Sequence, residues 1–492
     1  MDDTTPTAKP LAGRVRSGVA WNVASVASSH LVWVVRSVIV ARLLAPSDFG
    51  LFGMAVTVLA ALTALTSVGL ELSVIVRQFK DDEEMSAHLN TVWTAGLARG
   101  VCVTLILLAA AYPASRFYGD PRLFGVLVAL SPLPLVQALQ NIGLVVLRKR
   151  IEFGRVALFE QTHNLVSTAI AVALALLLGD VRAIVLGQLA GAAAGVALSY
   201  VFHPYRPRLM FDREAFREAY GFAKYTFVIY LMSYVTTAAD NVVVGRLYGA
   251  GALGLYILAY TMATLPVAVV GGALGGGTFP AYVEMSAKEP ARLEGAFARV
   301  FGVASATLVL LAVPLAVAAD EIVVLLYGVK WAAAGPVLRV LATVGFLRGM
   351  LQVISPLLVS VRGLRPDAFS KTFEAVLFLV LLYPLTARYG LLGAAWAAVV
   401  VYVCTIAGRF RMIKLTAPGA FRPCLRSLAA STLAALAGLS VGALALGATS
   451  SPPARLFTGG LSAFLTTLAV VLLVTPELRR TLLDNLPRAR RR

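Results

Sequence analysis

The chain has 492 residues, of which 59% are hydrophobic and only 14% are charged, and its mean hydropathy is +0.81. A soluble domain carries about 25% charged residues, so this composition excludes a soluble globular protein and indicates a chain that lies in a bilayer. The formal charge of +18 would suit a nucleic-acid-binding protein, but nearly all basic residues fall in short loops between apolar stretches. We therefore expect membrane lipids, and no nucleic acid, among the partners.

Apolar stretches of about 20 residues, the length that crosses roughly 30 Å of hydrocarbon, recur fourteen times. The first is too long for the core of a signal peptide, so we expect it to be retained as a helix. The sequence predicts an all-α integral membrane protein with helices near 19–41, 50–76, 89–112, 122–147, 156–178, 181–202, 221–245, 252–282, 297–319, 333–361, 369–387, 390–408, 427–447 and 455–474.

Loop charge predicts which side of the membrane each loop faces. With the N-terminus in the cytoplasm, the loops that return to that side carry basic clusters such as Arg148-Lys149-Arg150, whereas the outer loops carry mostly single basic residues. An excess of Lys and Arg in short loops marks the cytoplasmic side. We therefore expect a multi-pass protein with both termini in the cytoplasm.

Two copies of one unit run through this pattern. At a constant offset, Arg42 falls on Arg246 and Gly50 on Gly254, and a second match pairs Gln140 with Gln352. Six predicted helices separate the starts of the two copies, so both would enter the membrane in the same direction. The sequence thus predicts two pseudo-symmetric six-helix bundles, related by an axis along the membrane normal, plus two C-terminal helices.

The expected divisions follow from these repeats. No loop between the predicted spans is long enough to hold a catalytic domain outside the membrane. The divisions are a cytoplasmic polar segment, an N-terminal bundle, a cytoplasmic linker, a C-terminal bundle, helices 13 and 14, and a basic cytoplasmic tail: 1–18, 19–202, 203–220, 221–412, 413–475 and 476–492.

The first predicted helix carries a polar stripe that includes Asn22, Ser29 and Arg36, which helical spacing places on one face. Lipid offers such groups no partner, so the stripe should face protein or a water-filled cavity. The alternative for the hydroxyl groups is that they bond neighbouring helices. The position equivalent to Arg36 in the second copy is Asp240, followed by Asn241. A short carboxylate cannot extend to the membrane interface as arginine can, so Asp240 is the stronger functional candidate.

Other spans add polar candidates. Arg348 and Gln352 share one face of the tenth helix, and Glu71 and Glu374 are candidate proton carriers. Basic residues outnumber acidic ones inside the spans, as an anionic ligand would require. We expect a cationic substrate cavity lined by Arg36, Arg348, Asn22, Ser29, Gln140 and Gln352, and a gating or coupling role for Asp240, Asn241 and Glu71.

Several further features have simpler interpretations. His30 and His163 fall off these stripes and are expected to be packing residues. Gly187, Gly191 and Gly195 form a small-residue face that is typical of close helix packing in lipid. The three cysteines and four histidines show no metal-ligand spacing, so we expect neither a metal nor a cofactor, with H⁺ or Na⁺ coupling left open.

Three motifs resemble the oligosaccharide flippases of the multidrug/oligosaccharidyl-lipid/polysaccharide exporter superfamily, most closely its Wzx-type branch. They are the doubled R-L-x₆-G-L-[F/Y] element that starts at Arg42 and Arg246, the Asp240-Asn241 pair before the second copy, and the run LRKRIEF over 147–153. Their order and spacing extend the resemblance over about residues 15–415.

This resemblance implies a flippase of the bacterial inner membrane rather than an enzyme. It would carry undecaprenyl-pyrophosphate-linked oligosaccharide to the outer leaflet by alternating access, for exopolysaccharide, O-antigen or capsule biosynthesis. Its partners would be the lipid-linked glycan and the polymerase and chain-length proteins of the same pathway.

Two other transporters share this architecture, a lipid II flippase and a cation-coupled drug exporter of the MATE type. The drug exporter should have an acidic and aromatic cavity, and the surplus of arginine argues against it. A membrane-bound glycan polymerase or ligase would need a catalytic acid or base beside a large outer loop, which this sequence does not offer.

The equivalent positions of Arg36 and Asp240 suggest one further hypothesis. The two opposite charges would neutralise each other when the bundles close at the outer side, and an arriving pyrophosphate would compete for the arginine. The alternative is that each side chain points to the outer interface and never meets the other.

Overall fold

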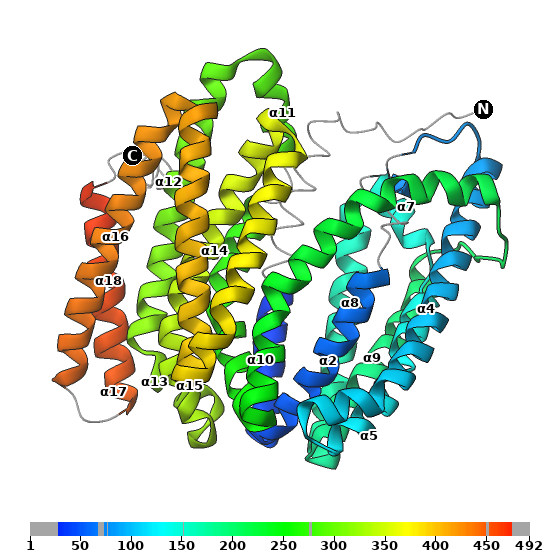
Figure 1. The fold of residues 1–492 in the computed structure, drawn as a ribbon, viewed down its shortest axis with the longest axis horizontal. Coiled ribbons are helices and arrows are strands. Elements are labelled where there is room, and N and C mark those ends of the chain that lie inside the picture. Colours follow the sequence, from blue (N-terminus) through cyan, green and yellow to red (C-terminus); the bar gives the residue numbers. More distant parts are fainter. Residues whose placement is uncertain are drawn as a thin grey trace, which may run out of the picture. The chain divides into compact units, whose positions relative to one another are not determined.

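The computed structural model describes residues 28–66, 73–75, 77–150, 152–274, 278–448 and 452–474. Throughout these residues the regular structure is helical, without a strand (Figure 1). This confirms the predicted all-α class. The predicted polar segment 1–18 and the basic tail 476–492 lie outside the described residues.

Among the described residues, ten helices are long and apolar enough to cross a membrane, or eleven if one bent pair counts as a single span. Two of the ten, Leu231–Gly272 and Arg365–Thr416, hold 42 and 52 residues. At about 1.5 Å per residue, each is far longer than one crossing of roughly 30 Å requires. The protein is therefore a multi-pass membrane protein, and the count of fourteen spans stays a prediction.

The chain forms two compact units. Unit 1 comprises the described parts of Met1–Leu44 and Ala55–Tyr234, and unit 2 those of Ala45–Met54 and Val235–Arg492. Helix α2 (Pro46–Thr66) and helix α10 (Arg213–Leu274) each begin in one unit and continue into the other.

Unit 1 is built from the helix over residues 28–43, most of α2 and the first part of α10, together with six further helices. These are α4 (Asp82–Tyr118), α5 (Arg122–Leu130), α6 (Leu133–Ala138), α7 (Gly143–Lys149), α8 (Phe153–Leu178) and α9 (Val181–Phe202). Their ends follow ordinary capping rules. The Asp81 carboxylate accepts a hydrogen bond from the Glu84 backbone at the start of α4, and left-handed Gly119 and Gly179 end α4 and α8.

The fourth predicted span, 122–147, is not one continuous helix. It is divided into α5, α6 and α7, with a bend of 57° before α7. Pro132 and Pro134 interrupt the helical hydrogen bonds between α5 and α6. Between α6 and α7, the Asn141 side chain makes hydrogen bonds in place of the helical ones. Its amide donates to the carbonyl groups of His203 and Tyr205 at 3.1 and 2.7 Å. Sequence hydropathy could not detect these breaks, because all three pieces are apolar.

Removing the Asn141 side chain should destabilise unit 1. Asn141→Leu leaves both carbonyl groups and the Gly143 backbone N–H, which donates to Asn141 Oδ1 at 2.9 Å, without these partners. We expect a loss of about 1–3 kcal/mol, visible as a lower thermal unfolding midpoint in detergent. Asn164→Leu is the matched control, since it removes the hydrogen bond that a half-buried amide donates to Ser29. An unchanged midpoint in the Asn141 variant would contradict this role.

Helices α8 and α9 pack closely through the predicted glycine face. A Cβ atom at Gly187 would lie 3.3 Å from Ala171 Cα, and one at Gly191 would lie 3.1 Å from Ser167 Oγ. The third glycine, Gly195, faces an α8 side chain in the same way. The interpretation of this motif as a helix-packing face is confirmed.

Unit 2 contains the start of α2, the second part of α10 and ten further elements. They are α11 (Thr278–Lys288), α12 (Pro290–Val317), α13 (Ala319–Tyr327), η1 (Val329–Ala334), α14 (Gly335–Arg362), α15 (Leu364–Thr416), α16 (Pro418–Gly447), α17 (Pro452–Arg455) with η2 (Leu456–Gly460), and α18 (Leu461–Val474). Both α10 and α15 change direction at a glycine with positive φ, Gly249 (76°) and Gly390 (63°). Helices α16 and α18 pack against each other and against α12.

The doubled sequence element makes one reciprocal contact inside unit 2. A Cβ on Gly50 would overlap the carbonyl oxygen of Ala250, and a Cβ on Gly254 would overlap that of Pro46. At the repeat offset, Pro46 is equivalent to Ala250 and Gly50 to Gly254. The contact of Gly50 with Ala250 and the contact of Gly254 with Pro46 therefore join the same two positions of the repeat. The start of α2 and the second part of α10 can cross this closely only because both positions lack a side chain.

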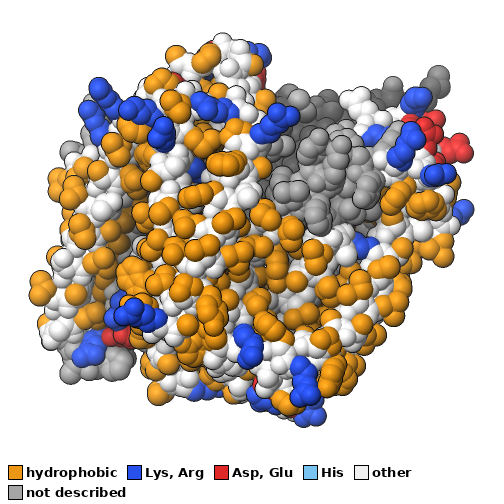
Figure 2. Space-filling model, in the orientation of Figure 1, with side chains coloured by type: hydrophobic (Ala, Val, Ile, Leu, Met, Phe, Trp, Pro, Cys, Tyr) orange, Lys and Arg blue, Asp and Glu red, His pale blue; other side chains and the backbone are white. Residues whose placement is uncertain are grey.

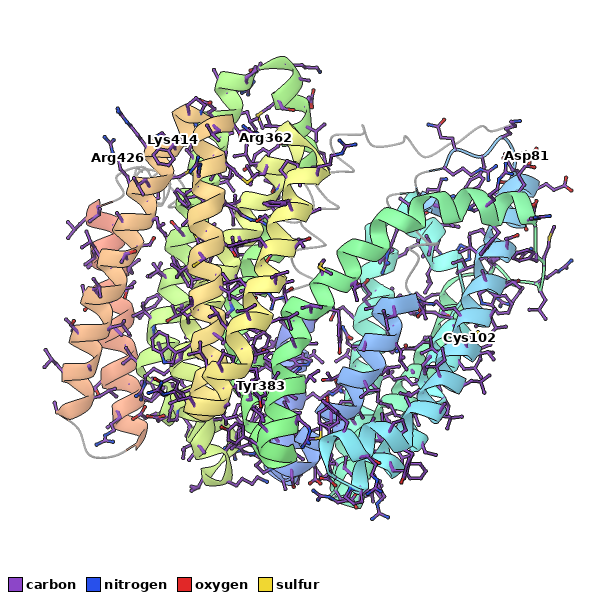
Figure 3. The ribbon with its side chains drawn as sticks, in the orientation of Figure 1. Asp81, Cys102, Arg362, Tyr383, Lys414 and Arg426 are labelled. Atoms are coloured by element: carbon purple, nitrogen blue, oxygen red, sulfur yellow. The ribbon has the colours of Figure 1, made fainter. Side chains whose placement is uncertain are left out.

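The surface of unit 2 fits a bilayer. Hydrophobic side chains cover α14, α15 and α16 along their length, with Lys and Arg at the ends (Figure 2). Figure 3 places Arg362, Lys414 and Arg426 at one end of these helices and Tyr383 near the other. All three basic residues lie in segments that the charge pattern assigns to the cytoplasm.

Candidate functional site

Unit 1 contains a cavity of about 770 Å³. Its walls come from the helix over 28–43, α4, the α6–α7 segment, α8 and α9. Glycines in its walls let neighbouring helices approach one another closely. A Cβ at Gly100 would lie 2.8 Å from Ala138 Cβ and 3.0 Å from the Pro134 carbonyl oxygen, so α4 lies directly against α6.

The cavity is cationic. Three arginines line it, Arg36, Arg99 and Arg148, whereas none of the described lining residues is Asp or Glu. The other polar side chains that line it are mostly carboxamides and hydroxyl groups, which bind anions and sugar hydroxyls equally well: Thr63, Gln137, Gln140, Asn141, Asn164, Ser167 and Gln188. Because none of the described lining residues carries a negative charge, the cavity surface is positive and favours an anionic ligand.

The arginines differ in what holds them. Arg36 is half-buried and makes no hydrogen bond or ion pair with the described part of the chain. Arg148 pairs with Glu160 at 3.1 Å, with both side chains largely exposed. Arg36 is therefore the cavity arginine that is most available to a ligand.

The predicted polar stripe of the first helix is divided in two by the structure. Ser29 accepts hydrogen bonds from Gln161 Nε2 at 2.7 Å and from Asn164 Nδ2 at 3.1 Å, and Ser28 donates to Gln161 Oε1 at 3.1 Å. These hydroxyl groups hold the first helix against α8, and Ser29 is not among the described lining residues. Arg36, on the same stripe, does line the cavity.

The remaining candidates lie in three places. Gln140 lines the cavity of unit 1. Gln352 lies on α14 of unit 2, exposed, with its amide beside Gly271 of α10. Asn22 and Glu71 fall outside the described residues.

Asp240 belongs to a buried polar network in unit 2. Its side chain is 3% exposed and accepts hydrogen bonds from Tyr256 Oη and from the Asn241 backbone N–H, each at 2.9 Å. Arg348 donates to Tyr260 Oη, its guanidinium lies 5.9 Å from the Tyr260 ring centroid, and its charge interacts with that of Asp240. Arg348 thus contacts buried phenol groups and compensates a carboxylate, and the hypothesis that Asp240 meets Arg36 stays a prediction.

A second charged group fixes α14 to α15. Arg409, 2% exposed, pairs with Asp367 at 3.0 Å, and Ser355 donates to the same carboxylate at 2.7 Å. Glu374 is 7% exposed, and the charges of Arg409 and Arg348 act on it. Unit 2 therefore holds two buried carboxylates, Asp240 and Glu374, and the partly buried Asp367 beside two arginines.

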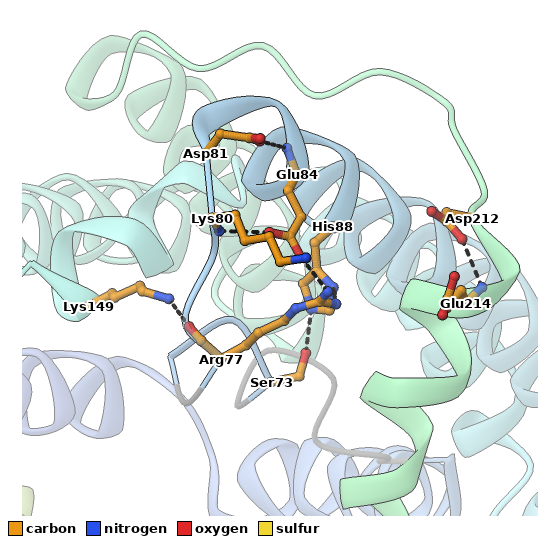
Figure 4. Close-up of polar contacts among 9 residues, drawn as sticks. All are labelled: Ser73, Arg77, Lys80, Asp81, Glu84, His88, Lys149, Asp212 and Glu214. Carbon is orange, nitrogen blue, oxygen red and sulfur yellow. Dashed lines mark hydrogen bonds and ion pairs between the residues drawn. The ribbon is translucent and has the colours of Figure 1, made fainter.

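Polar contacts at one end of unit 1 join the segment 73–84 to α4 and α7 (Figure 4). Arg77 pairs with Glu84 at 2.6 Å and contacts Nδ1 of buried His88, while Lys149 donates to the carbonyl groups of Val74 and Arg77. Nearby, Asp212 accepts a hydrogen bond from the Glu214 backbone at 2.8 Å, so α10 begins at Arg213 rather than near 221.

His163 was expected to be a packing residue, and it does pack, against Phe159 and Gly195. It also lines the cavity from α8, which the sequence analysis did not predict. It stands one turn before Ser167 and opposite Gly195 of α9. The sequence offers one indication of this position: the helical face of His163 lies opposite the glycine face of the following span. An analysis of polar stripes within single helices does not compare the faces of two helices.

This fold and this cavity define a class. In its described part the chain has ten apolar helices of spanning length, two helical units and a cationic cavity lined by neither Asp nor Glu, as a membrane transporter would. Its fold matches solved structures of the MOP superfamily. The lipid II flippase MurJ in an inward closed conformation aligns with a TM-score of 0.68 and 15% identity, over 94% of this chain and 99% of MurJ. An inward-facing MATE family multidrug resistance transporter of the MOP superfamily aligns with a TM-score of 0.63 and 16% identity, over 79% and 95% of the two chains.

The chain belongs to the polysaccharide biosynthesis protein family, whose model matches residues 39–336. Among its relatives, the succinoglycan biosynthesis transport protein ExoT of Rhizobium meliloti is 26% identical over 82% of this chain and 79% of ExoT. The lipopolysaccharide biosynthesis protein WzxC of Escherichia coli is 25% identical over 84% and 83% of the two chains. The resemblance drawn from the sequence motifs is confirmed.

Proposed function

We propose that this protein is a flippase that moves undecaprenyl-pyrophosphate-linked oligosaccharide across the bacterial inner membrane by alternating access. The observation that carries the proposal is the cavity of unit 1, which presents three arginines and no described carboxylate. A pyrophosphate brings opposite charge and oxygen acceptors that match the guanidinium fork. The polyprenyl tail would remain in lipid, where its apolar surface is not exposed to water.

The size and the remaining lining of the cavity suit the head of such a lipid. A volume of about 770 Å³ is within the range of small-molecule sites and accommodates a pyrophosphate with its first sugars. Carboxamides such as Gln137 and Gln188 can both donate to and accept from sugar hydroxyls. The names of ExoT and WzxC, which refer to succinoglycan transport and lipopolysaccharide biosynthesis, support an oligosaccharide cargo.

The two units would have different tasks. The buried carboxylates of unit 2, Asp240 and Glu374, are the groups through which H⁺ or Na⁺ coupling would act, since a cation would balance the charge beside Arg348 and Arg409. Rocking of helical units about a fixed site is the general way such transporters expose it to one leaflet at a time. Polymerase and chain-length proteins of the same pathway would receive the product.

A binding experiment tests the site. Purified protein in detergent should bind undecaprenyl pyrophosphate at least about tenfold more tightly than undecaprenol, because only the former carries charge for the arginines. Arg99→Gln should reduce this preference, and added salt should weaken it. Equal affinity for the two lipids would overturn the proposal, as would a preference for cationic drugs.

The orientation can be measured separately. In a background without the native cysteines, of which Cys102 and Cys404 are exposed, single cysteines at Arg150 and Arg208 should resist an impermeant thiol reagent added to intact cells. Arg182→Cys, at the start of α9, should react as the matched outer control. Labelling of the first two sites in intact cells would contradict cytoplasmic termini.

A further inference from the structure

His163 is held rigidly at the wall of the cavity. Its ring stacks on Phe159, with centroids 6.2 Å apart and planes 7° from parallel. Its Nδ1 lies 3.4 Å from Ser167 Oγ, one turn further along α8. Stacking and this hydrogen bond fix both the plane of the imidazole and the direction of its second nitrogen.

Gly195 provides the space that the imidazole occupies. A Cβ there would lie 2.7 Å from His163 Cε1 and 2.8 Å from Nδ1, closer than van der Waals contact permits. Gly187 and Gly191 bring α9 against α8, but only Gly195 faces the histidine ring. The close approach of the two helices therefore sets the position of the ring as well as the packing.

The charges around His163 are of one sign. Arg36 is near enough for its charge to act on the imidazole, and Arg99 and Arg148 line the same cavity from α4 and α7. The α9 side chains facing the cavity are glycines, Gln188, Ala192 and Val196. No carboxylate among the described lining residues faces the ring, and Nε2 has no hydrogen-bond partner in the described part of the chain.

We propose that His163 is a substrate-positioning residue that acts beside Arg36. With the Ser167 hydroxyl donating to Nδ1, Nε2 carries a hydrogen and donates it to an oxygen of the bound pyrophosphate. Arg36 supplies the charge, and His163 supplies a directed donor that fixes the orientation of the head in the cavity. This inference rests on the proposed function, because it names a second contact in the same site.

The affinity for undecaprenyl pyrophosphate, measured with purified full-length protein, tests the role of His163. His163→Leu should weaken binding by about tenfold. His163→Gln should recover most of it, because the Gln amide can donate from nearly the position of Nε2. Gly195→Ala should also weaken binding by displacing the ring. Gly154→Ala, on α8 but away from the described lining residues, places its Cβ where nothing lies within 4 Å; it is the control and should bind normally.

The outcomes separate this inference from the proposed function. If His163→Leu binds as the unmodified protein does while Arg36→Gln does not, His163 has no positioning role and the cavity remains the site. If neither change affects binding, the cavity itself is not the site. If the leucine variant fails to fold, the glutamine and Gly195→Ala variants decide: unaltered binding by Gly195→Ala overturns the inference. His30→Leu, in the same unit but not among the described lining residues, should leave affinity unchanged.

Discussion

Arg36→Gln should abolish glycan export in a strain that lacks the native gene, while the protein is still inserted in the membrane. Removing the guanidinium takes away charge-assisted hydrogen bonds worth about 1.5–3 kcal/mol each, which corresponds to a loss of roughly 10- to 100-fold per bond. Because Arg36 has no partner in the described part of the chain, its removal leaves no buried carboxylate uncompensated. Its loss should therefore affect transport rather than folding.

Two further variants complete this experiment. Arg36→Lys keeps the charge but not the fork, and should retain part of the export. Arg182→Gln removes an arginine of unit 1 that is exposed and paired with Asp180 at the surface, and should export normally. Surface polysaccharide and membrane abundance are measured for each. Normal export by Arg36→Gln at normal abundance would show that the cavity does not handle the cargo.

Arg348→Gln should instead destabilise the protein. Arg348 donates to Tyr260 and its charge compensates Asp240, which is 3% exposed. Neutralising the arginine leaves a buried carboxylate without its compensating charge, at a cost of about 3 kcal/mol. Thermal unfolding in detergent measures the loss. Removing both charges, in Arg348→Gln with Asp240→Asn, should recover part of the stability, because the amide still accepts from Tyr256.

The matched control for the buried pair of Arg348 and Asp240 is an exposed ion pair. Arg339 pairs with Asp320, and about half of each side chain is accessible to solvent. Arg339→Gln should change stability by less than about 1 kcal/mol. If Arg348→Gln is as stable as Arg339→Gln yet fails to export glycan, Arg348 contacts the cargo directly, as the sequence pattern first indicated.

The sequence analysis predicted features that depend on local periodicity. Apolar stretches of spanning length predicted the helical class, and the spacing of Gly187, Gly191 and Gly195 predicted a close helix contact, because both patterns lie within one helix. The breaks around α6 were not predicted, since hydropathy records neither the helix-breaking effect of the prolines nor the tertiary hydrogen bonds of Asn141.

The candidate site shows the same limit more sharply. Helical spacing grouped Ser29 with Arg36. In the structure, the amides of Gln161 and Asn164 on α8 donate hydrogen bonds to the Ser29 hydroxyl, whereas the Arg36 side chain lines the cavity. Which polar groups a neighbouring helix satisfies is a property of packing between helices. For the same reason the place of His163 at the cavity wall was not predicted, because its ring packs against a glycine of a different helix.

The reciprocal contact of Gly50 and Gly254 has the form of an interface in a twofold homodimer. In such an interface one surface patch meets its own copy, so any substitution appears twice. Here the two copies are joined in one polypeptide, and each glycine could have changed independently of the other. Both positions are glycine, while the equivalent positions Arg36 and Asp240 carry opposite charges. The crossing thus has the form of a self-complementary twofold interface within one chain, whereas other equivalent positions are free to carry different chemistry.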